Sequence, residues 1–170
     1  MVVTGGAARI GRNISLALAR SGFSVAVHYF SSENEAKEVV SEIQSSGGKA
    51  THVKCNLSDS KSVSEIISKA EESLGPVVGL VNNASKFSHD DISNISTESW
   101  SDHMEVNALS PILLIGELAR RLPDGKMACI VNILDQKIAQ PNPDHLSYTA
   151  SRYAMLGVTD ALARGLAPSI

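Results

Sequence analysis

Five short apolar runs alternate with longer stretches of helical periodicity, and this alternation constrains the fold more than any other feature. Each run is apolar nearly throughout, as expected for strands that helices cover on both faces. Strand, helix, strand repetition predicts a parallel sheet with right-handed crossovers, a Rossmann-like, doubly wound α/β fold of about five strands. The expected strands are 1–4, 24–29, 50–55, 77–82 and 127–134, and the expected helices are 9–21, 33–46, 60–74, 98–121 and 145–167.

The length of 170 residues fits one domain spanning 1–170. A net charge of -3 gives no electrostatic reason to expect nucleic acid or a membrane surface as a partner. No apolar run reaches the ~20 residues of a membrane span, and no signal peptide or metal-ligand cluster is evident. Cys55 and Cys129 fall in apolar runs, so we expect buried, reduced thiols in a cytoplasmic protein.

Both ends suggest an incomplete domain. About three residues precede the first glycine turn, where a strand of five or six is usual. The chain ends directly after the last expected helix, which would leave 127–134 as an apolar edge strand.

A glycine-rich turn, TGGAARIG at 4–11, follows the first expected strand and opens a helix. Glycines at this point let the backbone approach a pyrophosphate, which then sits at the helix N-terminus. The alternative is a plain tight turn. The position within the alternating pattern favours the dinucleotide site.

The second expected strand ends in VAVHYFSS, with no acidic residue until Glu33. An acidic residue there would bind the ribose 2′-hydroxyl of NAD. His28, Ser31 and Ser32, with Arg9 from the glycine turn, instead suit a 2′-phosphate and favour NADP(H). Arg9 could alternatively be a solvated cation, and His28 a hydrogen-bonded strand-end histidine.

Tyr148 and Arg152 lie four residues apart on an expected helix, and therefore on one face. A phenol beside a fixed cation is a candidate proton donor, because the cation favours the phenolate and should lower the pKa of Tyr148. The alternative is an ordinary helix surface.

Together with CNLSD at 55–59, VNNAS at 81–85 and VN at 106–107, these motifs resemble the short-chain dehydrogenase/reductase family along essentially the whole chain. HYFSS, NNASKF and NILD resemble its pteridine reductase branch. So do Arg9, in place of the family's middle glycine, and Asp135, where most members carry a serine.

The resemblance implies a role for each matching residue. Gly5, Arg9, Ile10 and Gly11 would hold the diphosphate and adenosine end of the cofactor, and Tyr29 would join His28, Ser31 and Ser32 around the 2′-phosphate. Asn56 and Leu57 would flank the adenine, and Asn82, Asn83, Ala84 and Ser85 would line the central pocket. Asn107 would kink its helix and hold a water, and Phe87 would either stack on a pterin or pack against its neighbours. Asp135 would relay a proton or orient the substrate, and Tyr148 would donate the proton.

The chain departs from the family in two ways. Arg152 stands where the family has lysine, and arginine is not deprotonated in proteins, so a proton relay through it should fail. The segments that the family places after the last helix are also absent from the sequence. We therefore expect reduced activity, and a nicotinamide end of the site that is open to water.

The implied activity is NADPH-dependent hydride transfer to a C=N or C=O group of a small molecule, such as a pterin. The alternatives are a reductase of 3-oxoacyl thioesters or other ketones, and a catalytically impaired dinucleotide-binding module. The resemblance also implies a homodimer or homotetramer that pairs through 98–121 and 145–167.

Overall fold

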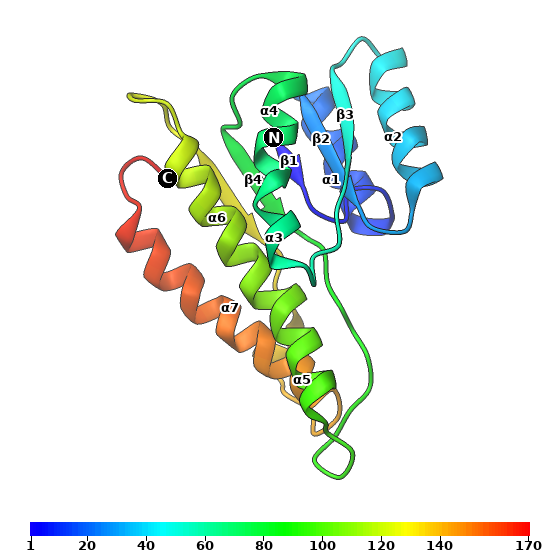
Figure 1. Cartoon of the computed structure of the whole chain (residues 1–170), viewed down its shortest axis with the longest axis vertical. Helices are drawn as coiled ribbons and strands as arrows, with labels where there is room; N and C mark the ends of the chain where they lie inside the picture. Colours follow the sequence, from blue (N-terminus) through cyan, green and yellow to red (C-terminus); the bar gives the residue numbers. More distant parts are fainter.

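A parallel five-stranded sheet in the order β3-β2-β1-β4-β5 forms the centre of the molecule (Figure 1). The computed structural model describes all residues 1–170. The strands are β1 Val2–Val3, β2 Val25–Tyr29, β3 Ala50–Lys54, β4 Gly79–Asn82 and β5 Cys129–Asn132. This arrangement confirms the predicted doubly wound α/β class.

Helices cover both faces of the sheet. One core joins α1 and α2 to the sheet and includes Leu16, Val27 and Val39; the other joins α4 and α6 to the opposite face and includes Ile66, Leu80 and Leu114. The helices are α1 Arg9–Arg20, α2 Glu33–Ser45, α3 Ser60–Val63, α4 Glu65–Leu74, α5 Thr97–Met104, α6 Ser110–Arg121 and α7 Leu146–Gly165.

Two expected helices are interrupted. The stretch expected at 60–74 divides into α3 and α4. The stretch expected at 98–121 divides into α5 and α6 around a π-helical turn at Glu105–Leu109, and a short 3-10 turn at Gln136–Ile138 precedes α7. π-Helical turns inside helices often lie at functional sites, and this one contains Asn107.

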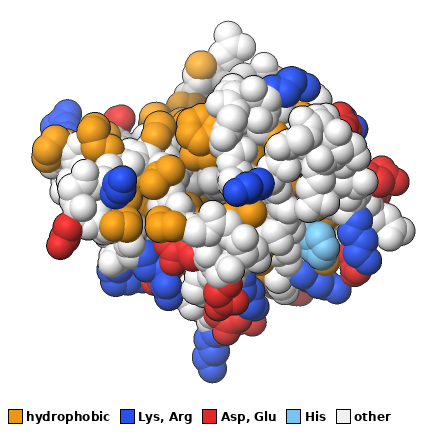
Figure 2. Space-filling model, turned by 90° about the horizontal axis from the view of Figure 1, so that it is seen from above, with side chains coloured by type: hydrophobic (Ala, Val, Ile, Leu, Met, Phe, Trp, Pro, Cys, Tyr) orange, Lys and Arg blue, Asp and Glu red, His pale blue; other side chains and the backbone are white.

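The edge strand β5 departs from the expectation that every strand is covered on both faces. Cys129 and Val131 are exposed on it, and the expectation that Cys129 is buried is wrong, whereas Cys55 is buried as expected. Hydrophobic side chains gather on the side of the molecule where α6, α7 and β5 lie (Figure 2). These β5 side chains are exposed because α1 and α2 cover one face of β1 to β3 and do not extend over the same face of β5.

None of the helices combines the length and the apolar character that crossing a bilayer requires.

Candidate active site

The glycine turn between β1 and α1 is packed too tightly for larger residues. A Cβ on Gly11 would lie 2.1 Å from the carbonyl oxygen of Gly5 and 2.6 Å from Nδ2 of Asn83. Gly5 itself has a φ of 60°, which favours glycine. The turn therefore brings the start of α1 against the loop that follows β4.

The N-terminus of α1 is open toward a cleft of about 450 Å³ at the carboxyl edge of the sheet. No side chain caps this end of the helix, and its first turn contains no acidic residue. Free N–H groups at a helix N-terminus bind anions, so the cleft suits a diphosphate. Residues expected at the cofactor that line this cleft are Gly5, Arg9, Ile10, Gly11, Tyr29, Ser31, Ser32, Asn83, Ala84, Ser85 and Arg152; Asp135, expected at the substrate, lines it as well.

Arg9 adopts a left-handed conformation with a φ of 51° and is exposed beside Ser31 and Ser32 at the edge of this cleft. Such a backbone conformation costs a non-glycine residue roughly 1–2 kcal/mol. Arg9, Ser31 and Ser32 therefore line one cleft, and a shared contact with a 2′-phosphate remains a prediction.

His28 does not line the cleft. It is buried, its Nδ1 accepts from the Gly5 N–H at 3.1 Å, and its Nε2 lies 3.1 Å from the Cys55 carbonyl. Burial lowers the pKa of His28 to about 4, so the ring is neutral at pH 7 and cannot neutralise a phosphate. Its contacts match the alternative stated above, a hydrogen-bonded strand-end histidine, and they hold the glycine turn in place.

Asn56 and Leu57 also lie outside the cleft lining. Asn56 Oδ1 accepts from the Ser58 N–H at 3.0 Å, and Leu57 is buried in the core while its carbonyl accepts from the Ser110 hydroxyl. Their expected contact with adenine remains a prediction.

Thr4 organises the middle of the cleft, and the sequence analysis did not assign it a role. Its hydroxyl oxygen accepts from the N–H groups of Asn83 at 2.9 Å and Ala84 at 3.0 Å. Asn83 Nδ2 donates to the Thr4 carbonyl at 2.9 Å. These contacts join β1 to β4 across 79 and 80 positions, and a contact at such a separation leaves no pattern in the sequence.

Asn107 joins three segments at the π-helical turn. Its Oδ1 accepts from the Lys86 N–H at 2.8 Å, and its Nδ2 donates to the Lys86 carbonyl at 2.9 Å and to the Ser151 hydroxyl at 3.0 Å. A π-helical turn interrupts the helix at the position where a kink was expected. Its side chain connects the loop after β4 to α7, and a water held there remains a prediction.

Tyr148, Asp135 and Arg152 come together at the carboxyl end of β5, as the sequence analysis expected. The Tyr148 hydroxyl donates to Asp135 Oδ2 at 2.8 Å. Arg152 is 5% exposed, and its Cζ lies 5.0 Å from the centre of the Tyr148 ring. The Arg152 guanidinium donates a long 3.4 Å hydrogen bond to the Ile133 carbonyl, and its Nε has no partner.

The direction of the Tyr148 pKa shift differs from the sequence-based expectation. Burial raises the pKa of Tyr148 above its ordinary value; Arg152 lowers it, but the hydrogen bond to Asp135 raises it further. The Lys137 backbone N–H lowers the pKa of Asp135, and Tyr148 and Arg152 act in the same direction. At neutral pH the pair is therefore a protonated phenol that donates to a carboxylate.

Phe87 and His145 form an aromatic wall beside the phenol. The two rings are stacked, with centroids 4.2 Å apart, and Phe87 meets the Tyr148 ring edge-on at 4.7 Å. Phe87 is 56% exposed and could stack on a flat ligand. His145 was not predicted from the sequence. It has a left-handed φ of 54° directly before α7, and no sequence pattern indicates this conformation.

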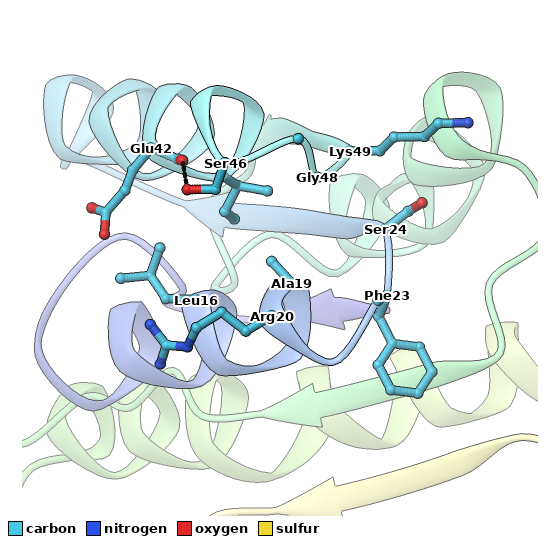
Figure 3. A pocket seen from close by; sticks show the side chains of 12 residues that line it. Leu16, Ala19, Arg20, Phe23, Ser24, Glu42, Ser46, Gly48 and Lys49 are labelled. Atoms are coloured by element: carbon cyan, nitrogen blue, oxygen red, sulfur yellow. Dashed lines mark hydrogen bonds between the residues drawn. The ribbon is translucent and has the colours of Figure 1, made fainter.

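A larger hollow of about 590 Å³ lies between the C-terminal ends of α1 and α2, at the opposite edge of the sheet (Figure 3). Arg20, Glu42 and Lys49 on its wall are exposed surface residues. Ser46 bonds the Glu42 carbonyl within its own helix. No group with catalytic geometry faces this groove, so the candidate active site is the cleft at the carboxyl edge.

The doubly wound sheet has a glycine turn at an open helix N-terminus, and the Tyr148 phenol bonds a carboxylate that lines the same cleft. These two features define a dinucleotide-binding protein of the oxidoreductase type.

Comparison with known proteins gives the same class and adds a family. The family model "short chain dehydrogenase" matches residues 1–170. The 3-oxoacyl-[acyl-carrier-protein] reductase FabG of Staphylococcus epidermidis is 30% identical over 166 residues, which cover 98% of this chain and 68% of the relative.

Two solved structures are also similar. FolM alternative dihydrofolate reductase 1 from Brucella canis, complexed with NADP, superposes with a TM-score of 0.96 at 37% identity, over 99% of this chain and 68% of that one. A short chain dehydrogenase from Burkholderia cenocepacia, also in complex with NADP, gives a TM-score of 0.93 at 30% identity, over 99% and 68%. The chain belongs to the short chain dehydrogenase family and spans about two thirds of the length of these relatives.

Proposed function

We propose that this protein is an NADPH-dependent oxidoreductase that reduces a C=N or C=O bond in a flat heteroaromatic substrate of the pterin type. The observation that carries the proposal is the Tyr148–Asp135 hydrogen bond of 2.8 Å, next to the exposed ring of Phe87. A ring can stack on Phe87 while a carboxylate accepts hydrogen bonds from amino groups at its edge. The similarity to FolM of Brucella canis supports this substrate class.

The cofactor is NADP(H), and the residues of the cleft fit it. The open N-terminus of α1 would hold the diphosphate, and Arg9 with Ser31 and Ser32 would hold the 2′-phosphate. Ser85 and Arg152 would lie toward the nicotinamide end, because they share the cleft with Asp135. When bound, the cofactor supplies a hydride to the carbon of the C=N or C=O bond.

The protein's own residues supply the proton and the orientation. Tyr148 gives its phenolic proton to the nitrogen or oxygen of the reduced bond, so that one hydride and one proton are added in total. Asp135 orients the substrate and holds the phenol until the substrate arrives. Arg152 keeps a positive charge near the phenolate that remains, and a water at Asn107 would return the proton in place of the family's lysine.

A second candidate is reduction of 3-oxoacyl thioesters or other ketones, which the 30% identity to FabG favours. A third is a dinucleotide-binding module with impaired catalysis, because Arg152 cannot release a proton. We also propose a cytoplasmic location and a homodimer or homotetramer. Exposed Trp100, Leu109 and Tyr153 on α5 to α7 support pairing through these helices, and sedimentation at several concentrations tests it.

Two measurements test the proposed function. The melting temperature should rise more with NADPH than with NADH, because a ligand that binds the folded state stabilises it in proportion to RT ln(1 + [L]/Kd). Loss of NADPH absorbance at 340 nm is then followed with a dihydropterin, dihydrofolate and a 3-oxoacyl thioester. Turnover with the thioester alone would replace the first candidate by the second, and NADPH binding without turnover on any substrate would support the third.

A further inference from the structure

Asp90 is a buried carboxylate in the loop between β4 and α5, and it is 2% exposed. Burying a carboxylate is costly unless hydrogen bonds compensate it. The sequence analysis gave Asp90 no role, and it lies outside the cleft lining. Its partners show what this charge does in the fold.

The first partner is the N-terminus of α7. His145, at the N-cap position, makes no side-chain cap. Instead the Leu146 N–H donates to the Asp90 carbonyl at 3.2 Å, and the Ser147 N–H donates to Asp90 Oδ1 at 3.1 Å. A residue 57 positions earlier in the chain therefore caps the helix that carries Tyr148, and its negative charge suits a helix N-terminus.

The second partner is α5. The Ser99 hydroxyl donates to Asp90 Oδ2 at 2.7 Å. The Ser99 carbonyl lies 2.8 Å from His103 Nδ1, and His103 Nε2 accepts from the Ser88 N–H at 3.2 Å. Both oxygens of the carboxylate are thus engaged, and the loop is tied at Ser88 and Asp90 to two helices.

The charge of Asp90 is maintained by these contacts. Burial alone would raise the pKa of Asp90, but hydrogen bonds from Ser147 and Ser99 outweigh it and hold the pKa below its ordinary value. Other titratable groups close to the network are His103, on α5, and Tyr148, whose rings are 6.4 Å apart. The carboxylate is therefore an ionised cap at neutral pH.

We propose that Asp90 is a positioning residue that fixes the first turn of α7 so that the Tyr148 hydroxyl meets Asp135 at the mouth of the cleft. Tyr148 directly follows Ser147, whose amide donates to Asp90, and the Tyr148 hydroxyl donates a hydrogen bond to Asp135. A displacement of the first turn would move the hydroxyl away from Asp135. The catalytic consequence rests on the proposed function, whereas the effect on Tyr148 does not.

Tyrosine labelled with ¹³C at Cζ gives three signals, from Tyr29, Tyr148 and Tyr153, and Tyr148→Phe identifies the relevant one. In Asp90→Ala the hydrogen bond to Asp135 is lost, so the midpoint of the Tyr148 titration should fall by about 1 pH unit. Asp90→Asn keeps the acceptor for Ser147 and should restore the midpoint. The matched control is Asp91→Ala, because Asp91 bonds only within its own turn.

An unchanged Tyr148 midpoint in folded Asp90→Ala overturns the proposal, and so does an Asp90→Asn variant that behaves like Asp90→Ala. If Asp90→Ala does not fold, the Tyr148 titration is measured in Ser99→Ala, which removes one hydrogen bond to the same carboxylate. The midpoint should fall in this variant too. With turnover measurable, kcat in Asp90→Ala should fall by roughly tenfold or more at unchanged KM for NADPH. Absence of turnover in the parent chain would contradict the proposed function and leave the titration as the test of Asp90.

Discussion

Replacing Asp135 by asparagine should lower the Tyr148 pKa, although burial, the largest cause of its rise, remains. Asparagine has the same shape and keeps an acceptor for the Lys137 N–H, which donates to Asp135 Oδ1 at 2.8 Å. It removes the negative charge 2.8 Å from the phenolic oxygen. The guanidinium of Arg152 then remains as the nearest charge to the ring.

The magnitude follows from two distances. At an effective dielectric constant of about 20, a carboxylate 2.8 Å from the phenolate oxygen opposes ionisation by about 6 kcal/mol. A guanidinium 5.0 Å from the ring favours ionisation by about 3 kcal/mol. Solvent in the open cleft reduces both, and we take roughly half of each. Loss of the carboxylate should then remove about 3 kcal/mol of opposition to ionisation and lower the Tyr148 pKa, while burial continues to raise it.

The assay is a pH titration of ¹³Cζ-labelled tyrosine, with Tyr29 and Tyr153 as internal references. Asp144→Asn is the control, because Asp144 pairs with Lys137 and does not bond Tyr148. A Tyr148 midpoint in Asp135→Asn that stays in place, or rises, would refute the conclusion that Asp135 opposes ionisation of this phenol.

Three further predictions concern single residues. Arg152→Lys should raise turnover with NADPH by roughly tenfold or more, since lysine can pass a proton; an equal rise in the exposed control Arg164→Lys would argue against a relay. Arg9→Gly should reduce the preference for NADPH over NADH about tenfold without lowering the melting temperature, because glycine tolerates a φ of 51°; retained preference in binding titrations would remove Arg9 from the 2′-phosphate site. For His28 the folded pKa of about 4 lies below the ordinary value of 6.5, so its contribution to stability, roughly 3 kcal/mol, is present above pH 6.5 and lost as pH falls toward 4. Calorimetry of His28→Gln should show a flatter decline over that range, and an identical slope would contradict the burial argument.

The sequence predicts the fold well because hydrophobic periodicity reports which faces are buried. The strand β2 and the helix α2 begin or end within one residue of expectation. The order of the strands was not predicted, because crossovers of one hand narrow the possible topologies without selecting one. Cys129 was misplaced for a related reason: an apolar run states that a strand can be covered, but not that another element covers it.

Much of the candidate site was predictable, yet the contacts that set its charges were not. The glycine turn and the Tyr148–Arg152 pair follow from position and spacing, whereas the asparagine roles came only from the resemblance to the family. The orientation of His28 toward Gly5 and Cys55, rather than toward the cleft, depends on which face of β2 it occupies. Asp90 bonds Ser147 across 57 positions, and a contact between a loop and a distant helix leaves no periodic signal.

Tyr148 illustrates the same limit: burial does most to raise its pKa, and neither its burial nor its contact with Asp135 follows from the spacing of residues. Its cationic neighbour is on the same helix and was visible from the spacing of four residues. Its anionic neighbour, Asp135, precedes that helix by a loop and approaches the phenol more closely. The Asp135 carboxylate disfavours ionisation of Tyr148. The Arg152 guanidinium favours it, and does so at every pH because arginine does not lose its proton. Asp135 and Arg152 therefore act on Tyr148 as a pair, and the arginine preserves the electrostatic part of the lysine's role while giving up proton transfer.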